Sequence, residues 1–300
     1  MRRPLRLHIT CALAIACACS KGPSHNPQPS AAPTAAPAAT QADEPLPSVS
    51  LPALSARAVP ELGALLTRRG VSGAVALLDG DAPTALCNDV ARCSEALTPA
   101  STFKIPNSVI GLETGVIADA DFVIPWDGVT RRMTAWNRDH TLRTAIRDSV
   151  VPYYQELARR VGPARMREWL ERLQYGNAQM GDHVDEFWLK GPLAITPLQQ
   201  LEFLRKLVRA RLPISARTRD IVLHITRLGE LDGKPLHGKT GWSDPDGPTE
   251  TGWFVGWIDD AQSPRYVAVA VVRPPRGIDL MPMRREIAEE ALRWRGSPSP

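Results

Sequence analysis

The sequence lacks the features that mark several large protein classes. Its six histidines show no metal-ligand spacing and it has no glycine-rich phosphate loop, so we predict neither a bound metal nor a nucleotide. Lysine and arginine are scattered and the formal net charge is only +4, without the concentrated basic stripe that nucleic-acid binding requires. There is no internal repeat, and beyond the N-terminus no apolar run is long enough to span a bilayer.

The first 19 residues have the composition of a secretory signal peptide. Three arginines among the first six residues precede a short apolar run, which ends among small residues at Cys17 and Cys19. The stretch 13–17 resembles a bacterial lipoprotein cleavage box, so Cys17 is the first candidate for lipidation and Cys19 the second; a plain signal peptide cut nearby is the alternative. We expect an exported, periplasmic protein, tethered to a bacterial membrane by lipid if either cysteine is acylated.

Composition divides the rest of the chain into a spacer, a folded domain and a short tail. Residues 20–55 are rich in proline, alanine, serine and threonine and contain almost no large apolar side chain. Such a segment cannot bury enough surface to fold, so we predict a disordered linker. The folded domain is expected over residues 56–296, because 43% of the chain is hydrophobic and supplies ample core, and residues 297–300 are expected to be a flexible tail.

Two cysteines, Cys87 and Cys93, fall within the predicted domain. An even pair in an exported chain suggests a disulfide that closes a small loop. Two free thiols are the alternative, because sequence spacing does not supply the Cα distance that a disulfide needs.

The pattern of apolar residues places strands at both ends of the domain and helices between them. Proline is expected to loosen the helix after Ser101 at Pro106 and to break the next helical region at Pro152 and at Gly162-Pro163, whereas Thr196 is expected to cap a helix. Helices are predicted over 60–69, 101–115, 141–169, 198–209 and 284–295, and strands over 71–78, 253–258 and 266–272. This order predicts a mixed α+β fold, in which distant parts of the chain form one sheet, a helical lobe is inserted between them, and a pocket lies at their junction.

Ser101 and Lys104 form the first candidate chemical pair. Residues three apart on a helix are neighbours, so the hydroxyl and the amine can approach each other. A serine is a poor nucleophile until a base takes its proton, and a lysine is a base only when burial or a neighbouring charge lowers its pKa. The alternative is a surface helix that begins with Ser101 as its N-cap.

Lys239-Thr240-Gly241 is the second candidate motif, at the expected start of a strand. A lysine, a hydroxyl and a residue without a side chain would let a carboxylated, peptide-like ligand lie against the strand edge. An ordinary turn after Gly238 is the alternative. The two motifs together are more informative than either alone.

With these motifs the chain resembles the class D, oxacillinase-type, serine β-lactamases of the penicillin-binding protein and β-lactamase superfamily. The related Ser-x-x-Lys and Lys-Thr-Gly set is known from class A enzymes and penicillin-binding proteins. Six segments match the family in order: 99–108 around Ser101, Ser149-Val150-Val151, Tyr175-Gly176-Asn177, Phe187 to Leu193 with Trp188, Lys239-Thr240-Gly241, and Gly252 to Trp257. The resemblance implies an antiparallel sheet flanked by helices with an inserted all-helical lobe.

The resemblance also implies the chemistry of the site. Ser101 would attack the lactam carbonyl and become acylated. Lys104 would be N-carboxylated by carbon dioxide, and the carbamate would serve as general base for acylation and deacylation, so no other cofactor is expected. Trp188, whose indole is a donor only, would hold the carbamate, unless it merely packs in the core.

Further residues receive roles from the same resemblance. Ser149 would pass a proton to the lactam nitrogen while Lys239 keeps the site electropositive. The backbone N–H groups of Ser101 and Trp242 would form the oxyanion hole. Arg284 would bind the substrate carboxylate, its alternative being a surface charge at a helix start. Val151, Thr240 and Gly241 complete the expected substrate-binding set, and Tyr175-Gly176-Asn177 is expected to shape the site.

Two other functions remain open at this point. A β-lactam sensor would share the fold and stay acylated, but sensors tend to carry a polar residue where this chain has Val151. A transpeptidase or carboxypeptidase would leave Trp188 without a role. Lys190 departs from the family pattern, because many relatives have an acidic residue there. A β-lactam is the expected small-molecule partner, and no motif specifies a substrate range or an oligomeric state.

Overall fold

The computed structural model describes residues 54–245, 247–260 and 263–296. The predicted signal peptide with Cys17 and Cys19, the linker up to residue 53 and the tail at 297–300 lie outside the described residues. None of the helices in the described part is long and apolar enough to cross a membrane.

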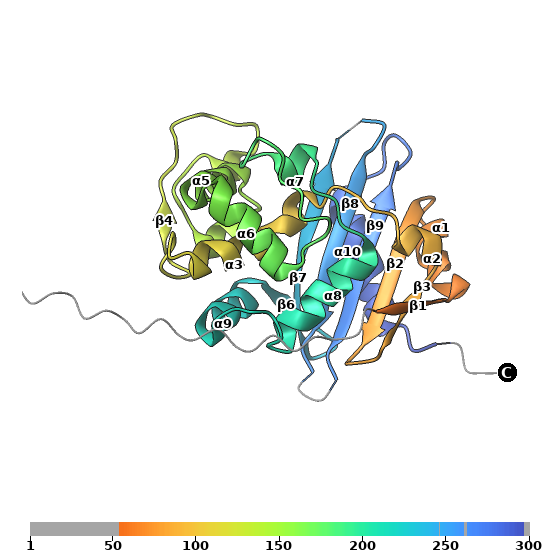
Figure 1. The fold of residues 1–300 in the computed structure, drawn as a ribbon. Helices are drawn as coiled ribbons and strands as arrows, with labels where there is room; N and C mark the ends of the chain where they lie inside the picture. The colour runs from red at the N-terminus through yellow and green to blue at the C-terminus, as the bar shows by residue number, and fades with distance from the viewer. Residues whose placement is uncertain (1–53, 246, 261–262, 297–300) are drawn as a thin grey trace, which may run out of the picture. The chain divides into compact units, whose positions relative to one another are not determined.

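A seven-stranded sheet in the order β1-β3-β2-β9-β8-β7-β6 forms the centre of the fold (Figure 1). β1 pairs with β3 in parallel, and every other pairing within this sheet is antiparallel. The strands are β1 (Ser55–Ala58), β2 (Ser72–Asp79), β3 (Thr84–Cys87), β6 (Arg227–Leu231), β7 (Lys234–Ser243), β8 (Thr251–Ile258) and β9 (Arg265–Val272). Because β2 pairs along its whole length with β9, the two ends of the domain meet in one sheet, as predicted.

Strands β2 and β9 carry several alanines on one face of the sheet and larger branched side chains on the other. On β2 and β9, small residues such as Ala74, Ala76 and Ala268 face one core, and larger ones such as Val75 and Val269 face the other. Helix α8 (Pro197–Val208) packs on the first face, and α10 (Leu280–Arg293), α1 (Ala64–Thr67) and η1 (Pro60–Gly63) pack on the second. Alanines let α8 approach the strands closely, which buries its apolar face beside the site described below.

A helical lobe lies beside the sheet, on the side of β6 and β7 (Figure 1). Its central helix, α3, packs against α4, α5, α6 and α9. The elements between β3 and β6, apart from α8, are α2 (Val90–Cys93), η2 (Ala100–Phe103), α3 (Lys104–Glu113), β4 (Val123–Ile124), η3 (Thr134–Trp136), β5 (His140–Thr141), α4 (Leu142–Arg147), α5 (Val151–Val161), α6 (Pro163–Leu173), α7 (Phe187–Lys190) and α9 (Ala216–Ile225). The inserted lobe of the sequence prediction is therefore confirmed.

Proline and capping residues explain where the helix boundaries differ from the prediction. Pro152 does not break a helix; it lies in the first turn of α5, where its missing N–H costs nothing, and the break is the turn just before it. Thr196 caps α8 as expected, with a capping box to Gln199. Helix α10 begins before residue 284 because Asp279 caps it, so Arg284 lies inside the helix.

Of the two alternatives for Cys87 and Cys93, the structure has the free thiols and not the disulfide, and both residues are buried. Cys87 is the last residue of β3 and Cys93 the last residue of α2. The Cys93 thiol donates to the Val75 carbonyl at 3.7 Å. A hydrogen bond with Cys87, together with burial, raises the pKa of Cys93, so this thiol stays neutral and unreactive.

Candidate active site

The segment before helix α3 is held from several sides. Ala100 has φ of 50°, a left-handed conformation that costs a non-glycine residue about 1–2 kcal/mol, and Ser101 follows it directly. The Trp253 indole on β8 donates to Thr98 O at 3.0 Å, and Gln200 on α8 donates to the Thr102 hydroxyl at 3.0 Å. The surrounding elements therefore impose the strained backbone that presents Ser101.

Ser101 and Lys104 meet as the sequence predicts. The Lys104 Nζ donates to the Ser101 Oγ at 2.7 Å. Ser101 is half-buried, whereas the Lys104 side chain has no solvent exposure. Burial, and then the charge of nearby Lys239, lower the pKa of Lys104 well below its usual value. Burial therefore favours the neutral form of the amine, which can accept a proton or react as a nucleophile.

The pocket around Lys104 is aromatic and contains one unused donor. The Tyr154 ring lies 5.3 Å from the Lys104 Nζ, and the Trp188 ring stacks on Phe103 with centroids 5.4 Å apart. Trp188 is fully buried, and its indole N–H has no hydrogen-bond partner in the described part of the chain. A buried donor without an acceptor costs about 1–3 kcal/mol, so an acceptor beside this N–H would be stabilising.

Lys239, Thr240 and Gly241 lie within β7 rather than at its start, because the strand begins at Lys234. A Cβ at Gly241 would come within 2.9 Å of the Pro99 carbonyl oxygen and 3.1 Å of Thr102. Glycine is thus required here so that β7 can lie against η2, a structural reason beyond the one that the sequence suggested. The Lys239 Nζ donates to the Thr240 carbonyl at 2.9 Å.

Arg284 is buried beside the same strand and is not a surface charge. Its Nη1 donates to Gly241 O at 2.6 Å, and its Nε has no partner among the described residues. Burial lowers the pKa of Arg284 to about 10; burial together with Arg284 lowers that of Lys239 to about 7. Two buried cationic groups close to β7 leave this side of the site ready for an anionic group.

Ser149 and Val151 belong to the opposite, helical side of the site. Ser149 lies on the turn between α4 and α5 with φ of 52°, and Val151 is the first residue of α5. Both helices pack against α3, which carries Lys104. Ser149 and Val151 therefore lie in the helical lobe that carries Lys104, while Lys239 and Arg284 belong to the sheet side.

Tyr175 and Asn177 pack against the segments around the site, in line with the expectation that they shape it. The Tyr175 ring packs edge-on against Phe103, and its hydroxyl donates to Gln200 at 3.4 Å. The Asn177 side chain accepts from the backbone N–H of Ala194 at 3.1 Å. Both residues thus brace the segments that carry the nucleophile and Trp188.

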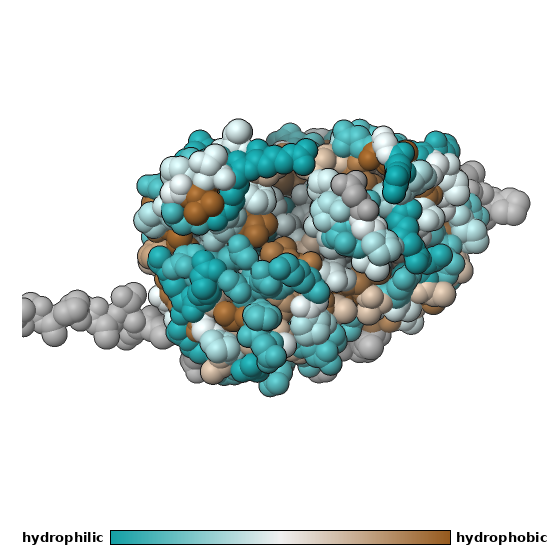
Figure 2. All heavy atoms as spheres, turned by 90° about the horizontal axis from the view of Figure 1, so that it is seen from above, coloured by the Kyte–Doolittle hydropathy of each residue, from teal (hydrophilic) through white to brown (hydrophobic). Residues whose placement is uncertain are grey.

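A hollow lies between the helical lobe and the sheet when the molecule is viewed from above, with apolar residues visible inside it (Figure 2). Two separate surface hollows are lined by other residues, one in the lobe that includes Trp136 and Val150 and one near the sheet that includes Trp242 and Glu250; neither is lined by Ser101 or Lys104. Trp242 is 40% exposed, and its indole donates to Glu250 at 2.8 Å.

Sequence reasoning missed the residues that support Lys104 from behind. The Ser108 hydroxyl donates to the Lys104 carbonyl at 2.7 Å and is also hydrogen-bonded to the Tyr154 hydroxyl at 2.9 Å. The i,i+4 spacing of Ser108 could have indicated its contact, but Tyr154 comes from α5 and carries no motif. Lys190, the departure from the family pattern, is exposed and pairs with Glu186 at 2.9 Å.

Comparison with known proteins identifies the family. Residues 74–292 match the model of the penicillin binding protein transpeptidase domain. The chain is 40% identical to β-lactamase OXA-48 of Klebsiella pneumoniae over 228 residues, 76% of this chain and 84% of that protein. It resembles the solved class D β-lactamase YbXI from Nostoc, with 39% identity, a TM-score of 0.73 and coverage of 77% and 97% of the two chains. The chain belongs to the class D β-lactamases.

This class D enzyme is a serine β-lactamase, as the sequence motifs predict. A receptor has the same fold: the C-terminal domain of the Bacillus licheniformis BlaR penicillin receptor has a TM-score of 0.75, 28% identity, and coverage of 81% of this chain and 98% of that one. Fold alone does not separate an enzyme from a receptor, so the assignment as an enzyme rests on the sequence identity to β-lactamases.

Replacing Lys104 by methionine is expected to stabilise this β-lactamase. Because burial lowers the pKa of Lys104 in the folded state, the protonated amine opposes folding at pH 7, a cost that fades as the pH rises toward about 10.4, the usual pKa of a lysine. Lys104→Met removes that cost and should gain about 1–3 kcal/mol at pH 7, but less at pH 9.5. Urea unfolding in bicarbonate-free buffer checks this; a less stable variant, or a gain independent of pH, contradicts it.

Proposed function

We propose that the protein hydrolyses β-lactams through an acyl-enzyme on Ser101, with N-carboxylated Lys104 as general base, and thereby confers resistance to penicillin-type antibiotics. Two observations carry the proposal: burial lowers the pKa of the fully buried Lys104, and Trp188, whose ring stacks on the neighbouring Phe103, has a buried indole N–H without a partner among the described residues. A carbamate on Lys104 would supply the acceptor that this donor lacks, and only a neutral amine can capture carbon dioxide. The residues present therefore fit the modification.

The chain's own groups account for acylation. A carbamate would act as an anionic oxygen base toward the Ser101 hydroxyl, whose oxygen forms a bond to the lactam carbonyl carbon. The N–H groups of Ser101 and Trp242 stabilise the oxyanion, each worth about 3 kcal/mol. Ser149 delivers a proton to the lactam nitrogen as the C–N bond breaks. In deacylation the base at Lys104 would take a proton from a water molecule whose oxygen bonds to the ester carbonyl carbon. The bond from that carbon to the Ser101 oxygen then breaks, and the proton passes to Ser101.

The sheet side of the pocket recognises the substrate. Arg284 has a buried Nε without a partner among the described residues, and a carboxylate on the substrate would satisfy it. Lys239 adds positive charge when protonated, and Thr240 adds a hydroxyl from the same strand. Val151, the first residue of α5, would provide an apolar contact from the lobe. Together these groups favour a small, anionic β-lactam.

A non-hydrolysing penicillin-binding role, such as that of a receptor, is the second candidate. The likeness to the BlaR receptor domain favours it, because that domain shares the fold over most of this chain. The apolar Val151 beside Ser149 is the sequence feature that favours turnover instead. The two functions differ in the fate of the acyl-enzyme, which kinetics can follow directly.

Hydrolysis of a chromogenic cephalosporin distinguishes the two functions. With saturating bicarbonate we expect continuous turnover by the wild type, and without bicarbonate a rate that falls during the reaction. Lys104→Ala should lower kcat at least about 100-fold, because it removes the general base. A stoichiometric burst without turnover would establish the receptor-like role, and turnover indifferent to bicarbonate would exclude the carbamate.

Trp188→Phe tests the proposed partner of the carbamate. The variant keeps the ring stacked on Phe103 but removes the N–H, so carboxylated Lys104 loses its donor. Half-maximal activity should require at least about tenfold more bicarbonate, with most of the activity recovered at saturation. Titration of the deacylation rate against bicarbonate measures this shift. An unchanged bicarbonate requirement would mean that Trp188 only packs in the core.

We also propose export and an N-terminal lipid anchor on Cys17, or on Cys19, which would keep the enzyme in the periplasm at a membrane. The support is the arginine-led apolar run and the small residues before each cysteine. Mass spectrometry of the mature N-terminus after expression in a Gram-negative host should find an acylated cysteine. An unmodified N-terminal residue beyond Cys19 would contradict the anchor.

A further inference from the structure

The turn that carries Ser149 adopts a conformation suited to glycine. Val150 N–H donates to Ala145 O at 2.9 Å and Ser149 N–H donates to Ile146 O at 3.3 Å, which is the Schellman pattern that closes a helix. Glycine is the usual residue at the left-handed position of this motif, but here it is Ser149, with φ of 52°. A serine there is strained, so the surrounding structure must hold it.

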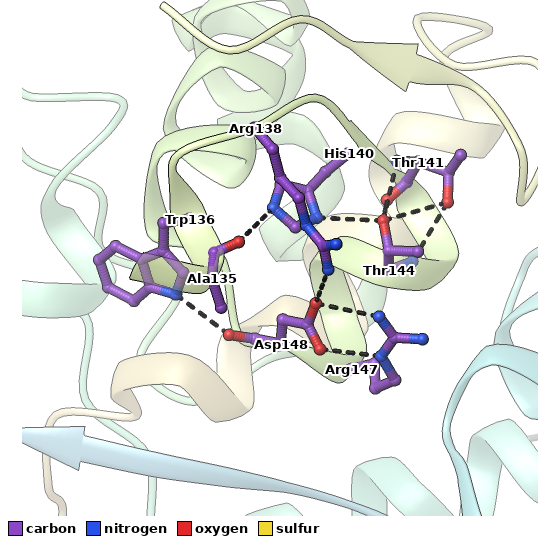
Figure 3. Close-up of polar contacts among 8 residues, drawn as sticks. All are labelled: Ala135, Trp136, Arg138, His140, Thr141, Thr144, Arg147 and Asp148. Atoms are coloured by element: carbon purple, nitrogen blue, oxygen red, sulfur yellow. Dashed lines mark hydrogen bonds and ion pairs between the residues drawn. The ribbon is translucent and has the colours of Figure 1, made fainter. Parts of the chain in front are cut away.

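Asp148, immediately before Ser149, is bound on both its backbone and its side chain (Figure 3). Its carbonyl oxygen accepts from the Trp136 indole at 3.1 Å. Its carboxylate accepts two hydrogen bonds from Arg147, at 2.8 and 3.0 Å, and a third from Arg138, at 3.1 Å. One residue thus joins the turn to its own helix and to the segment before β5.

That segment is itself ordered by a buried histidine (Figure 3). One ring nitrogen of His140 lies 2.8 Å from Ala135 O, and the other lies 3.1 Å from the Thr144 hydroxyl on α4. Trp136 and Arg138 are therefore fixed relative to α4 before they contact Asp148. The donors that reach Asp148 come from a preorganised wall of the pocket and not from a free loop.

From these contacts we infer that Asp148 is a positioning residue for Ser149: through Trp136, Arg138 and Arg147 it holds the left-handed turn that aims the Ser149 hydroxyl into the pocket. The inference rests on the role of Ser149 in the proposed function. No part of Asp148 touches the substrate in this account, so its effect reaches the reaction only through Ser149.

The solvent exposure of the ion pairs of Asp148 indicates whether its loss should change the stability of the fold or the rate of the reaction. The side chains of Arg138 and Arg147 are 57% and 61% exposed, so their pairs with Asp148 add little to the stability of folding. The three hydrogen bonds nevertheless restrict the orientation of the turn. Loss of the Asp148 charge should therefore change a rate much more than a melting temperature.

A double-mutant cycle tests the inference. We measure the acylation rate of a chromogenic cephalosporin by stopped flow in saturating bicarbonate, for Asp148→Asn, Ser149→Ala and the double variant. Asp148→Asn should slow acylation about tenfold when Ser149 is present, and less than about twofold in the Ser149→Ala background, with the Tm nearly unchanged. Trp136→Phe, which keeps the ring and removes the N–H, should behave in the same way.

Asp121→Asn is the matched control. The Asp121 carboxylate accepts two hydrogen bonds, at 3.3 and 3.4 Å, from Arg143 of α4, the helix that also carries Arg147, but Asp121 lies away from the turn that carries Ser149. It should leave acylation unchanged. Equal losses from Asp148→Asn in both backgrounds, or no loss in either, would overturn the positioning role while leaving Ser149 its own. A wild-type rate in Ser149→Ala alone would instead overturn the proposed role of Ser149, and the inference with it.

Discussion

The burial of one lysine beside one serine governs the rest of this structure. Lys104 lies in an aromatic pocket without solvent, 2.7 Å from the Ser101 hydroxyl, and its neutral state depends on that burial. A core that hosts an amine gives up stability, since an apolar side chain of similar volume would pack there without a desolvation cost. The surrounding elements, α3, α5, α7 and η2, are arranged so that this costly group remains buried and in reach of the nucleophile.

The sheet contributes by holding a strand unusually close to the nucleophile. Gly241 permits β7 to lie against η2, because any side chain would meet the Pro99 carbonyl. That approach brings Lys239 near enough to lower the pKa of Lys104 further, and Arg284 in turn lowers the pKa of Lys239. Besides burial, the charge of Arg284 thus favours the neutral form of Lys239, and the charge of Lys239 favours the neutral form of Lys104. An anionic substrate, or an anionic group on Lys104, would relieve the repulsion among these groups.

The sequence predicted those features that depend on local spacing. The contact of Ser101 with Lys104 follows from three residues on a helical turn, and the cap at Thr196 follows from local chemistry. Features set by tertiary approach were missed or misjudged: the position of Lys239 in the middle of β7, the start of α10 before Arg284, and the contact of Tyr154 with Lys104. The left-handed turn at Ser149 gave no signal either, since the residue that usually marks it, glycine, is absent.

On each side of the site, a residue other than glycine adopts the left-handed conformation that glycine usually takes. Ala100 and Ser149 both adopt positive φ values without being glycine, one next to the nucleophile and the other at the proposed proton donor. Glycine would relieve the strain at Ser149 but would also remove the hydroxyl on which the proton transfer depends. The sequence therefore retains a functional side chain at a position where the backbone disfavours it. Contacts with other residues must then hold the left-handed conformation that glycine would adopt without strain. At Ser149 these contacts are the hydrogen bonds from Trp136, Arg138 and Arg147 to Asp148.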